Sequence, residues 1–462
     1  MAALPRPTGR LKPVREVADR WAAATDLVGR GSSPEEALRQ AGVSDADRLR
    51  LVGPGAGTWT ELVDVWPSLR ALVVEPGPSA ASILLSSRGA HVTVVDGCAR
   101  RRAFRRAVWP DGPVEVAEDA AGALAARGCF DLITVELGPS GWPVGDMAAM
   151  VDPLRPDGAL ALLCENPVSP LRAIDRLRGR SVTGGAAWLG RLVREGERFG
   201  FGDAQVFGLL RSALSPTTAF DLSARQTAAL VIEAARPYVV GGRQIALSLM
   251  SGLARRGLAA MAVPAWLVVL RREDTAPGLL GRRSGRISFF DSWEGKVVWG
   301  EPPRHLEKRY RNDREASAEH HALTMLAAAA VDFVPRILDR PAPDRLVLSW
   351  TPGRTLEVAA LSNRDLSAWI GRAASTLAYL HTATKREDGT VLVHGDYWLG
   401  NLLVEGDRIV GVIDWSESYL GRPEDDLHFL VDSLLDLHSK ARAIHGRLIE
   451  VAREAYAGTS PF

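Results

Sequence analysis

The sequence predicts a multidomain protein, with a doubly wound α/β domain followed by a two-lobed α+β domain. Three observations predict this organisation. The chain has 462 residues, which is too long for one ordinary domain. Between residues 71 and 163, apolar strands alternate with helical stretches, as in a parallel sheet covered by helices. After residue 285 the order changes to paired strands, a helix and a hairpin, and helices follow the hairpin.

The composition argues against a nucleic-acid-binding protein and against a membrane protein. Hydrophobic residues make up 46% of the chain, and the net charge of +1 provides no field that would attract nucleic acid or an anionic membrane. The three cysteines, at 98, 129 and 164, form no metal-binding spacing and favour a reducing compartment. The sequence has no apolar signal core and no run of membrane-spanning length. We therefore expect a cytoplasmic protein with no transmembrane segment and no nucleic-acid partner.

The first half is predicted to hold N-terminal helices over residues 1–44 and an α/β domain over residues 45–272. The clearest unit of this domain starts at Ala71 and runs as strand, turn, helix and strand. Glu75 ends its first strand and Asp96 ends its second. In such a unit, an acid about twenty residues after the first turn meets the ribose hydroxyls of a cofactor. This spacing makes Asp96 a candidate cofactor-binding residue.

The order of elements over roughly residues 50 to 270 resembles that of class I S-adenosylmethionine-dependent methyltransferases. The resemblance implies a Rossmann-like sheet and a site for S-adenosylmethionine. Glu75 and Gly77 match the first motif of that family, and Asp96 matches its ribose-binding acid. Asp119 matches the acid that faces the adenine amino group. The resemblance therefore implies a cofactor site made of these four residues.

The turn after Glu75 departs from the methyltransferase pattern. Ser79 and Ala81 stand where the family has glycines, which let the backbone approach a cofactor and take positive φ. Because both side chains are small, the turn still has room for the cofactor. Two alternatives stay open for this domain. It binds S-adenosylmethionine and methylates an acceptor, or it is a scaffold that does neither.

The second half is predicted to begin after a polar linker rich in proline and glycine, residues 273–285. Residues 286–352 read as a small β-lobe with one long helix. Residues 353–462 read as a helical lobe that also carries a short β-hairpin.

The chemistry of the second half is concentrated on one loop and the strand pair that follows it. Asp396 and Asn401 stand five residues apart on the loop, and Asp414 ends the apolar strand beyond it. Phosphoryl transfer needs Mg²⁺ held against the phosphates and a carboxylate aimed at the attacking hydroxyl. Asp396 suits the catalytic base. Asn401 and Asp414 carry the hard oxygen ligands that Mg²⁺ prefers.

The run His394-Gly395-Asp396, then four residues, Asn401, and later Ile413-Asp414-Trp415 resembles the aminoglycoside phosphotransferase family, a branch of the protein-kinase-like fold. The resemblance implies a bilobal kinase fold that uses ATP and Mg²⁺ to phosphorylate a hydroxyl group. A further match lies in the run from Gly421 to Leu427. There the resemblance implies that Asp426 braces the catalytic loop.

The small lobe should supply a lysine for the α- and β-phosphates, and only Lys296 and Lys308 are available there. We expect Lys308 to fill this role, because it lies shortly before a predicted helix that carries Glu315 and Glu319. Glu319 lies beside the apolar stripe of that helix, so it is the expected partner of the lysine. The alternative, with Lys296 on the phosphates, stays open.

Together the two halves resemble the bifunctional methyltransferase–kinase enzymes that modify the ends of bacterial surface polysaccharides. The resemblance implies transfer of the γ-phosphoryl group to a sugar or glycan hydroxyl, with methylation of the same acceptor. An antibiotic or natural-product phosphotransferase joined to a non-catalytic methyltransferase-like scaffold is the alternative enzyme. A scaffold that binds nucleotide without turnover is the alternative that is no enzyme. The acceptor and the oligomeric state stay open.

Overall fold

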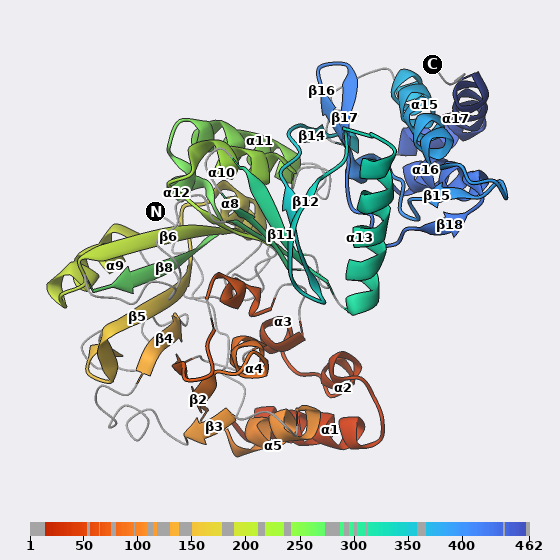
Figure 1. Cartoon of the computed structure of the whole chain (residues 1–462). Helices are drawn as coiled ribbons and strands as arrows, with labels where there is room; N and C mark the ends of the chain where they lie inside the picture. The colour runs from red at the N-terminus through yellow and green to blue at the C-terminus, as the bar shows by residue number, and fades with distance from the viewer. Residues whose placement is uncertain are drawn as a thin grey trace, which may run out of the picture. The chain divides into compact units, whose positions relative to one another are not determined.

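The fold is described from a computed structural model of the whole chain (Figure 1). The residues that the structure describes are 14–52, 56–63, 65–74, 80–96, 98–109, 114–117, 130–137, 150–177, 189–210, 218–234, 242–272, 287–290, 295–299, 303–310, 312–357, 366–437 and 439–458. The chain forms two compact units. Unit 1 comprises Met1–Ala219 and Val263–Arg282, and unit 2 comprises Phe220–Ala262 and Arg283–Phe462.

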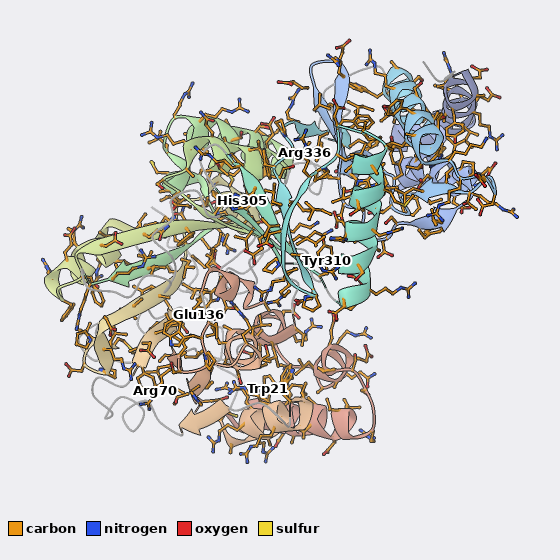
Figure 2. All side chains as sticks on the ribbon, viewed as in Figure 1. Trp21, Arg70, Glu136, His305, Tyr310 and Arg336 are labelled. Atoms are coloured by element: carbon orange, nitrogen blue, oxygen red, sulfur yellow. The ribbon has the colours of Figure 1, made fainter. Side chains whose placement is uncertain are left out.

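Three helices open the described part of unit 1, and the first two lie within the predicted N-terminal helical segment, residues 1–44. They are α1 (Val14–Gly29), α2 (Pro34–Gln40) and α3 (Asp45–Val52). The Ser33 side chain caps α2, where proline occupies an early position in the first turn. Trp21, which Figure 2 labels, packs edge-on against Phe104 of α5 (Ala99–Val108), with 5.3 Å between the ring centroids. These contacts give the N-terminal helices an apolar core of their own.

The sheet of unit 1 has the strand order β6-β8-β5-β4-β1-β2-β3. The five strands from β5 to β3 run parallel, and β8 and β6 are antiparallel to their neighbours. Every residue of β4 and β8 is buried, as in a sheet covered on both faces. The elements are β1 (Arg70–Val74), β2 (His91–Val95), β3 (Val114–Ala117), β4 (Phe130–Glu136), β5 (Leu154–Glu165), β6 (Asp203–Leu210), β8 (Ala265–Arg271), η1 (Thr58–Leu62), α4 (Ala80–Ser87), α8 (Pro170–Leu177) and α9 (Leu189–Arg198).

An insertion between β6 and β8 leaves unit 1 and returns to it. Its elements are β7 (Thr218–Asp221), α10 (Arg225–Ala234), α11 (Gly242–Arg255) and α12 (Ala259–Ala262). From Phe220 to Ala262 the insertion belongs to unit 2. The compact units therefore partition the chain differently from the predicted domain boundaries, which placed these helices with the first domain.

The small lobe of unit 2 is an antiparallel sheet of order β12-β13-β11-β10-β9. Its long helix, α13, packs against β12 and β13 (Figure 1). The side chain of Asn312 caps α13 by accepting from the backbone N–H of Glu315 at 3.0 Å. The elements are β9 (Ile287–Phe290), β10 (Gly295–Trp299), β11 (His305–Arg309), α13 (Asp313–Ala328), β12 (Ile337–Ala342) and β13 (Arg345–Ser349).

The helical lobe of unit 2 carries the predicted hairpin, β16–β17, which pairs with the short strand β14. A second small sheet pairs β15 with β18. Buried side chains of α15, the hairpin and the C-terminal helices form one core with those of the small lobe. The elements are β14 (Arg354–Thr355), α15 (Leu366–Thr384), β15 (Val391–Val393), η2 (Leu399–Asn401), β16 (Leu402–Glu405), β17 (Arg408–Val412), β18 (Tyr419–Gly421), α16 (Pro423–Leu437) and α17 (Ser439–Gly458).

A doubly wound parallel sheet in unit 1 and an α+β arrangement in unit 2 confirm the predicted fold class. Among the described helices, none combines the length and the apolar character needed to span a bilayer.

Candidate active site

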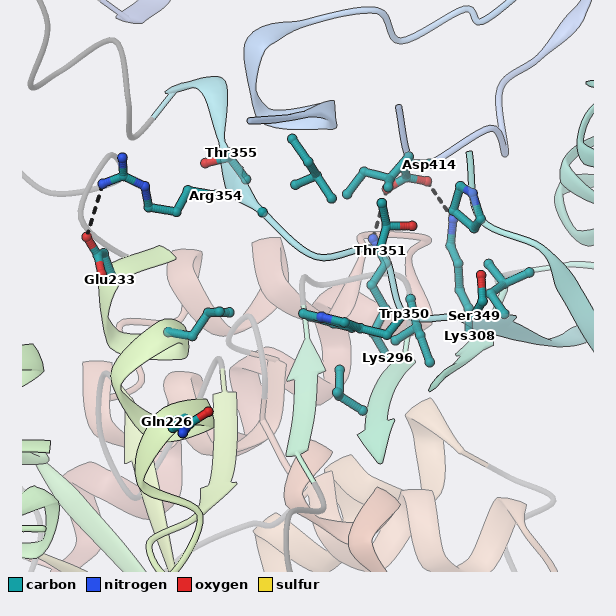
Figure 3. Close-up of a pocket in the computed structure, with 18 of the residues that line it drawn as sticks. Gln226, Glu233, Lys296, Lys308, Ser349, Trp350, Thr351, Arg354, Thr355 and Asp414 are labelled. Carbon is teal, nitrogen blue, oxygen red and sulfur yellow. Dashed lines mark hydrogen bonds and ion pairs between the residues drawn. The ribbon is translucent and has the colours of Figure 1, made fainter. Parts of the chain in front are cut away.

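Unit 2 contains a pocket of about 450 Å³ (Figure 3). This volume falls within the usual range for small-molecule sites. Its walls are mostly apolar, and its polar side chains gather at two ends. One end carries Lys296, Lys308, Glu319 and Asp414, and the other carries Gln226, Glu233, Arg255 and Arg354.

The Lys308–Glu319 pair predicted from the sequence is present. The Lys308 ammonium of β11 donates to the Glu319 carboxylate of α13 at 2.7 Å, and the Tyr310 hydroxyl donates to the same carboxylate oxygen at 2.7 Å. Lys308 and Glu319 are each 1% exposed. Glu315, the other acid considered, instead accepts a hydrogen bond from the side chain of Asn312 at the start of the helix. The pair therefore fixes the Lys308 ammonium in one position.

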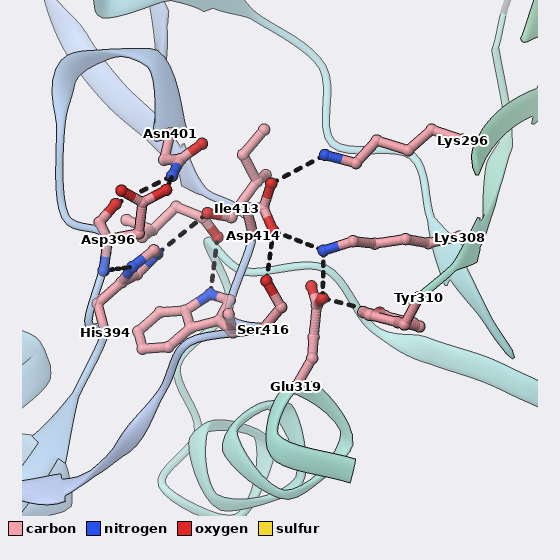
Figure 4. A network of polar contacts seen from close by, with 12 residues as sticks. Lys296, Lys308, Tyr310, Glu319, His394, Asp396, Asn401, Ile413, Asp414 and Ser416 are labelled. Carbon is pink, nitrogen blue, oxygen red and sulfur yellow. Dashed lines mark hydrogen bonds and ion pairs between the residues drawn. The ribbon is translucent and has the colours of Figure 1, made fainter. Parts of the chain in front are cut away.

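Lys296 lies directly opposite Lys308 on the antiparallel strands β10 and β11. Residues opposite one another in such a pair project from the same face, so both ammonium groups reach the same place. That place is the Asp414 carboxylate, which is 2.9 Å from the Lys296 nitrogen and 2.5 Å from the Lys308 nitrogen (Figure 4). Burial alone would raise the pKa of Asp414, but the two lysines outweigh it and hold this pKa well below its usual value.

The backbone at Asp414 is in the left-handed region, with φ of +71°. A non-glycine residue rarely adopts this conformation, which costs about 1–3 kcal/mol and is found where surrounding contacts enforce it. Here the enforcing contacts are the two lysines and the Ser416 hydroxyl, which donates to Asp414 at 3.1 Å. The Asp414 carboxylate is therefore held in one orientation by contacts from three side chains.

Asp396 and Asn401 are joined on the catalytic loop. The Asn401 amide nitrogen donates to both the backbone carbonyl and the carboxylate of Asp396, each at 2.9 Å. Burial, with repulsion from Asp414, raises the pKa of Asp396 to about 6. A carboxylate with a pKa near neutrality suits a general base, which must be deprotonated and still able to accept a proton.

His394 connects the catalytic loop to the strand that leads to Asp414. Its Nδ1 accepts from the backbone N–H of Asp396 at 3.2 Å, and its Nε2 donates to the carbonyl of Ile413 at 3.0 Å. Its ring lies 4.4 Å from that of Trp415 and is fully buried. Burial lowers the pKa of His394, so the ring is neutral with its proton on Nε2. This tautomer holds Asp396 and Asp414 at a fixed separation.

Asp426 braces the same loop, as predicted. Its carboxylate accepts from the backbone N–H groups of His394 at 2.7 Å and Gly395 at 2.9 Å. A third contact, at 3.0 Å, comes from the His381 ring of α15. Asp426 is 1% exposed, so its role is to position the loop and not to meet a substrate. The prediction that it is structural is confirmed.

Of the cofactor residues predicted in unit 1, only Asp96 lies in the described part of the chain; Glu75, Gly77 and Asp119 lie outside it. Asp96 is 2% exposed. It accepts from the guanidinium of Arg101 at 2.8 Å and from the backbone N–H of Cys98 at 2.9 Å, and the Arg105 guanidinium lies 3.7 Å away. A ribose would need carboxylate oxygens open to the cofactor. In this structure both Asp96 oxygens face arginines of α5.

Sequence reasoning missed three features of these sites. The first is the joint contact of both lysines with Asp414, which depends on strand register. The second is the pairing of Asp96 with Arg101 and Arg105, which stand five and nine residues later. That spacing places both arginines on one face of a helix, a signal that was present in the sequence. The third is the wall that α10 adds to the pocket.

Comparison with known proteins supports the kinase interpretation for the C-terminal part. Residues 383–461 match the sequence model of the phosphotransferase enzyme family. This segment contains Asp396, Asn401, Asp414 and Asp426. The C-terminal part is thus a phosphotransferase domain of the kinase type, which confirms the predicted class of enzyme. A search of curated proteins found no match.

Solved structures give fold-level likenesses to both halves. The WbdD structure with a kinase inhibitor is 15% identical, covers 84% of each chain and has a TM-score of 0.26. The macrolide 2'-phosphotransferase MphH from Brachybacterium faecium is 19% identical over 36% of this chain and 75% of its own, with a TM-score of 0.27. A putative sarcosine dimethylglycine methyltransferase from Galdieria sulphuraria is 13% identical over 54% of this chain and 91% of its own, with a TM-score of 0.28. Because these TM-scores are low, the proposals below rest on the family match and the site geometry.

Proposed function

We propose that this protein is an ATP-dependent phosphotransferase that moves the γ-phosphoryl group to a hydroxyl of a sugar or glycan. The observation that carries the proposal is the convergence of two lysines, Asp414 and the Asp396–Asn401 pair in unit 2. Phosphoryl transfer requires charge stabilisation at the phosphates and a carboxylate for the attacking hydroxyl. The site offers both.

The position of each residue in the pocket suggests its role in the reaction. Lys308, held by Glu319, neutralises the α- and β-phosphates. Lys296 is a second cation at the same end of the pocket. Asp396 accepts the proton of the acceptor hydroxyl as that oxygen attacks the γ-phosphorus, and the bond from phosphorus to the ADP oxygen breaks.

Asn401 and Asp414 are the proposed ligands of Mg²⁺, which when bound would neutralise the phosphate charge that develops during transfer. Their donor atoms fit this ion, because carboxylate and amide oxygens are hard ligands. Within the described residues, no cluster of three or more His, Cys, Asp or Glu side chains suits a metal. This agrees with Mg²⁺, which takes few ligands from a protein and the rest from phosphates and water.

The acceptor is proposed from chemistry alone. A carboxylate base at a phosphate site selects an alcohol, and sugars are the commonest polyols available to such an enzyme. A natural-product or antibiotic hydroxyl is the second candidate, because a carboxylate base can accept the proton of any alcohol that reaches it. The proposal keeps the cytoplasmic location expected from the sequence, where ATP is abundant.

Unit 1 is proposed to act without S-adenosylmethionine. Turning the buried Asp96 carboxylate toward a cofactor would break its ion pair with Arg101, whose side chain is 18% exposed. This observation favours the scaffold alternative over methylation of the acceptor.

The test of the kinase proposal is Mg²⁺-dependent release of ADP from ATP, with water as a slow acceptor, in three variants. Asp396→Asn should keep ATP binding and lower turnover by roughly 100-fold or more, since a positioned base contributes that much. Asp414→Asn should lose Mg²⁺-dependent turnover. Asp407→Asn, on the exposed turn of the β16–β17 hairpin, is the matched control and should behave as wild type. Near-normal turnover in both site variants would overturn the proposal.

A further inference from the structure

We propose that helix α10 forms the nucleoside-binding wall of the pocket, with Leu230 in contact with the purine and ribose of ATP. This inference rests on the proposed function and adds to it a binding surface outside the segment that matches the phosphotransferase family. The helix lies in the insertion between β6 and β8, far in sequence from the catalytic loop.

The orientation of a nucleotide in the pocket follows from its charges. The lysines and Asp414 occupy one end, so the triphosphate and its metal belong there. The nucleoside then meets the rest of the lining, which is mostly apolar and includes Leu348 and Leu403. The end opposite the lysines is where α10 lines the cavity (Figure 3).

One face of α10 lines the pocket. Its four lining residues are Gln226, Ala229, Leu230 and Glu233. They stand at positions i, i+3, i+4 and i+7, which is the spacing of a single helical stripe. The side chains between them, including Ile232, are buried in the protein interior. The helix therefore packs its other side into the protein interior and lines the cavity with a separate stripe.

Contacts from two other elements hold this stripe in place. The Glu233 carboxylate lies 2.7 Å from the guanidinium of Arg255 on α11 and 3.9 Å from that of Arg354 on β14. Strand β14 pairs with β16, which carries Leu403 of the pocket wall. Exposed ion pairs such as these contribute little stability, about 0–1 kcal/mol, but they fix orientation. They join α10 to β14, the strand that pairs with β16.

The chemistry of the stripe suits a nucleoside. Ala229 and Leu230 offer an apolar surface for the flat face of a purine, and Gln226 and Glu233 offer polar groups on either side of it. A free polyphosphate has no group that would use this surface. The wall should therefore contribute to the binding of ATP and not to the binding of tripolyphosphate.

The experiment compares Leu230→Asn with Leu249→Asn in the full-length protein. Leu249 lies on α11, is 59% exposed and does not line the pocket, so it controls for an added amide on a helix of the same insertion. Dissociation constants are measured for Mg²⁺·ATP and, by competition, for Mg²⁺·tripolyphosphate. Leu230→Asn should weaken ATP binding about tenfold, or roughly 1.4 kcal/mol. It should leave tripolyphosphate binding unchanged.

Equal weakening of both ligands would overturn the inference, because it would mean a general distortion of the pocket. Unchanged ATP binding in a folded Leu230→Asn variant would also overturn it, while leaving the kinase proposal intact. Absence of ATP binding in the wild-type protein would instead be a failure of the proposed function. Thermal melting of each variant checks that the fold is retained.

Discussion

At the scale of single residues, the use of lysine is informative. The chain has only five lysines, at positions 12, 296, 308, 385 and 440, within a total of 56 lysines and arginines. Two of these five meet at the Asp414 carboxylate. Lysine presents a compact point charge, whereas arginine presents a planar fork. In a protein that otherwise uses arginine, these two positions fit a site that needs point charges close to phosphate oxygens.

The two lysines should not contribute equally. Lys308 is 1% exposed and aimed by Glu319, whereas the Lys296 side chain is 24% exposed. We predict that Lys308→Met lowers kcat/KM for ATP by roughly 100-fold, the loss expected on removing one preorganised charge contact. Lys296→Met should have a smaller effect. Steady-state kinetics at varied ATP concentration measures both, and the reverse ranking would assign the principal phosphate contact to Lys296.

The sequence could predict the residues of the catalytic loop because local geometry determines their relations. Asp396 and Asn401 lie on one loop, and Asp414 follows on the hairpin directly beyond it, so spacing alone brings them together. The contact of Lys308 with Glu319 was also predictable, since strand and helix are neighbours in the chain. The position of Lys296 was not, because it depends on the register between β10 and β11.

At the scale of elements, the start of the catalytic loop depends on one glycine. Gly395 has φ of +81°, and a Cβ at this position would lie 2.3 Å from the carbonyl oxygen of Glu417. A side chain here would be strained by its conformation and would also collide with backbone. Its N–H is also one of the two that Asp426 accepts. The loop that carries Asp396 can therefore form only with glycine at this point.

We predict that Gly395→Ala destabilises unit 2 and abolishes turnover, because the collision displaces the loop. Gly406→Ala on the β16–β17 turn is the matched control. Gly406 also has positive φ, +62°, but nothing lies within 4 Å of an added Cβ. Gly406→Ala should lower the free energy of unfolding only by the cost of a left-handed alanine, about 1–2 kcal/mol. Chemical unfolding followed by a turnover assay measures both, and equal losses in the two variants would contradict this account of the loop.

At the scale of the whole molecule, the chain passes between its two units more than once. The helical insertion of residues 220–262 belongs to unit 2, although β6 and β8 on either side of it belong to unit 1. The sequence does not show what the helices at these positions pack against, because an apolar helix face is compatible with either unit. A prediction of domain boundaries from linear order could not detect this exchange. The doubly wound sheet was predictable because its strands follow one another in the chain.

Unit 2 is proposed to hold a Mg²⁺-dependent ATP site, and unit 1 is proposed to hold no site for S-adenosylmethionine. Calorimetric titration of the full-length protein with each ligand tests both parts directly. We expect binding of ATP that requires Mg²⁺, and no heat of binding with S-adenosylmethionine. Absence of Mg²⁺·ATP binding would contradict the kinase site. Saturable binding of S-adenosylmethionine would contradict the proposal that the arginines around Asp96 keep the cofactor out. It would favour methylation of the phosphorylated acceptor as the function of unit 1.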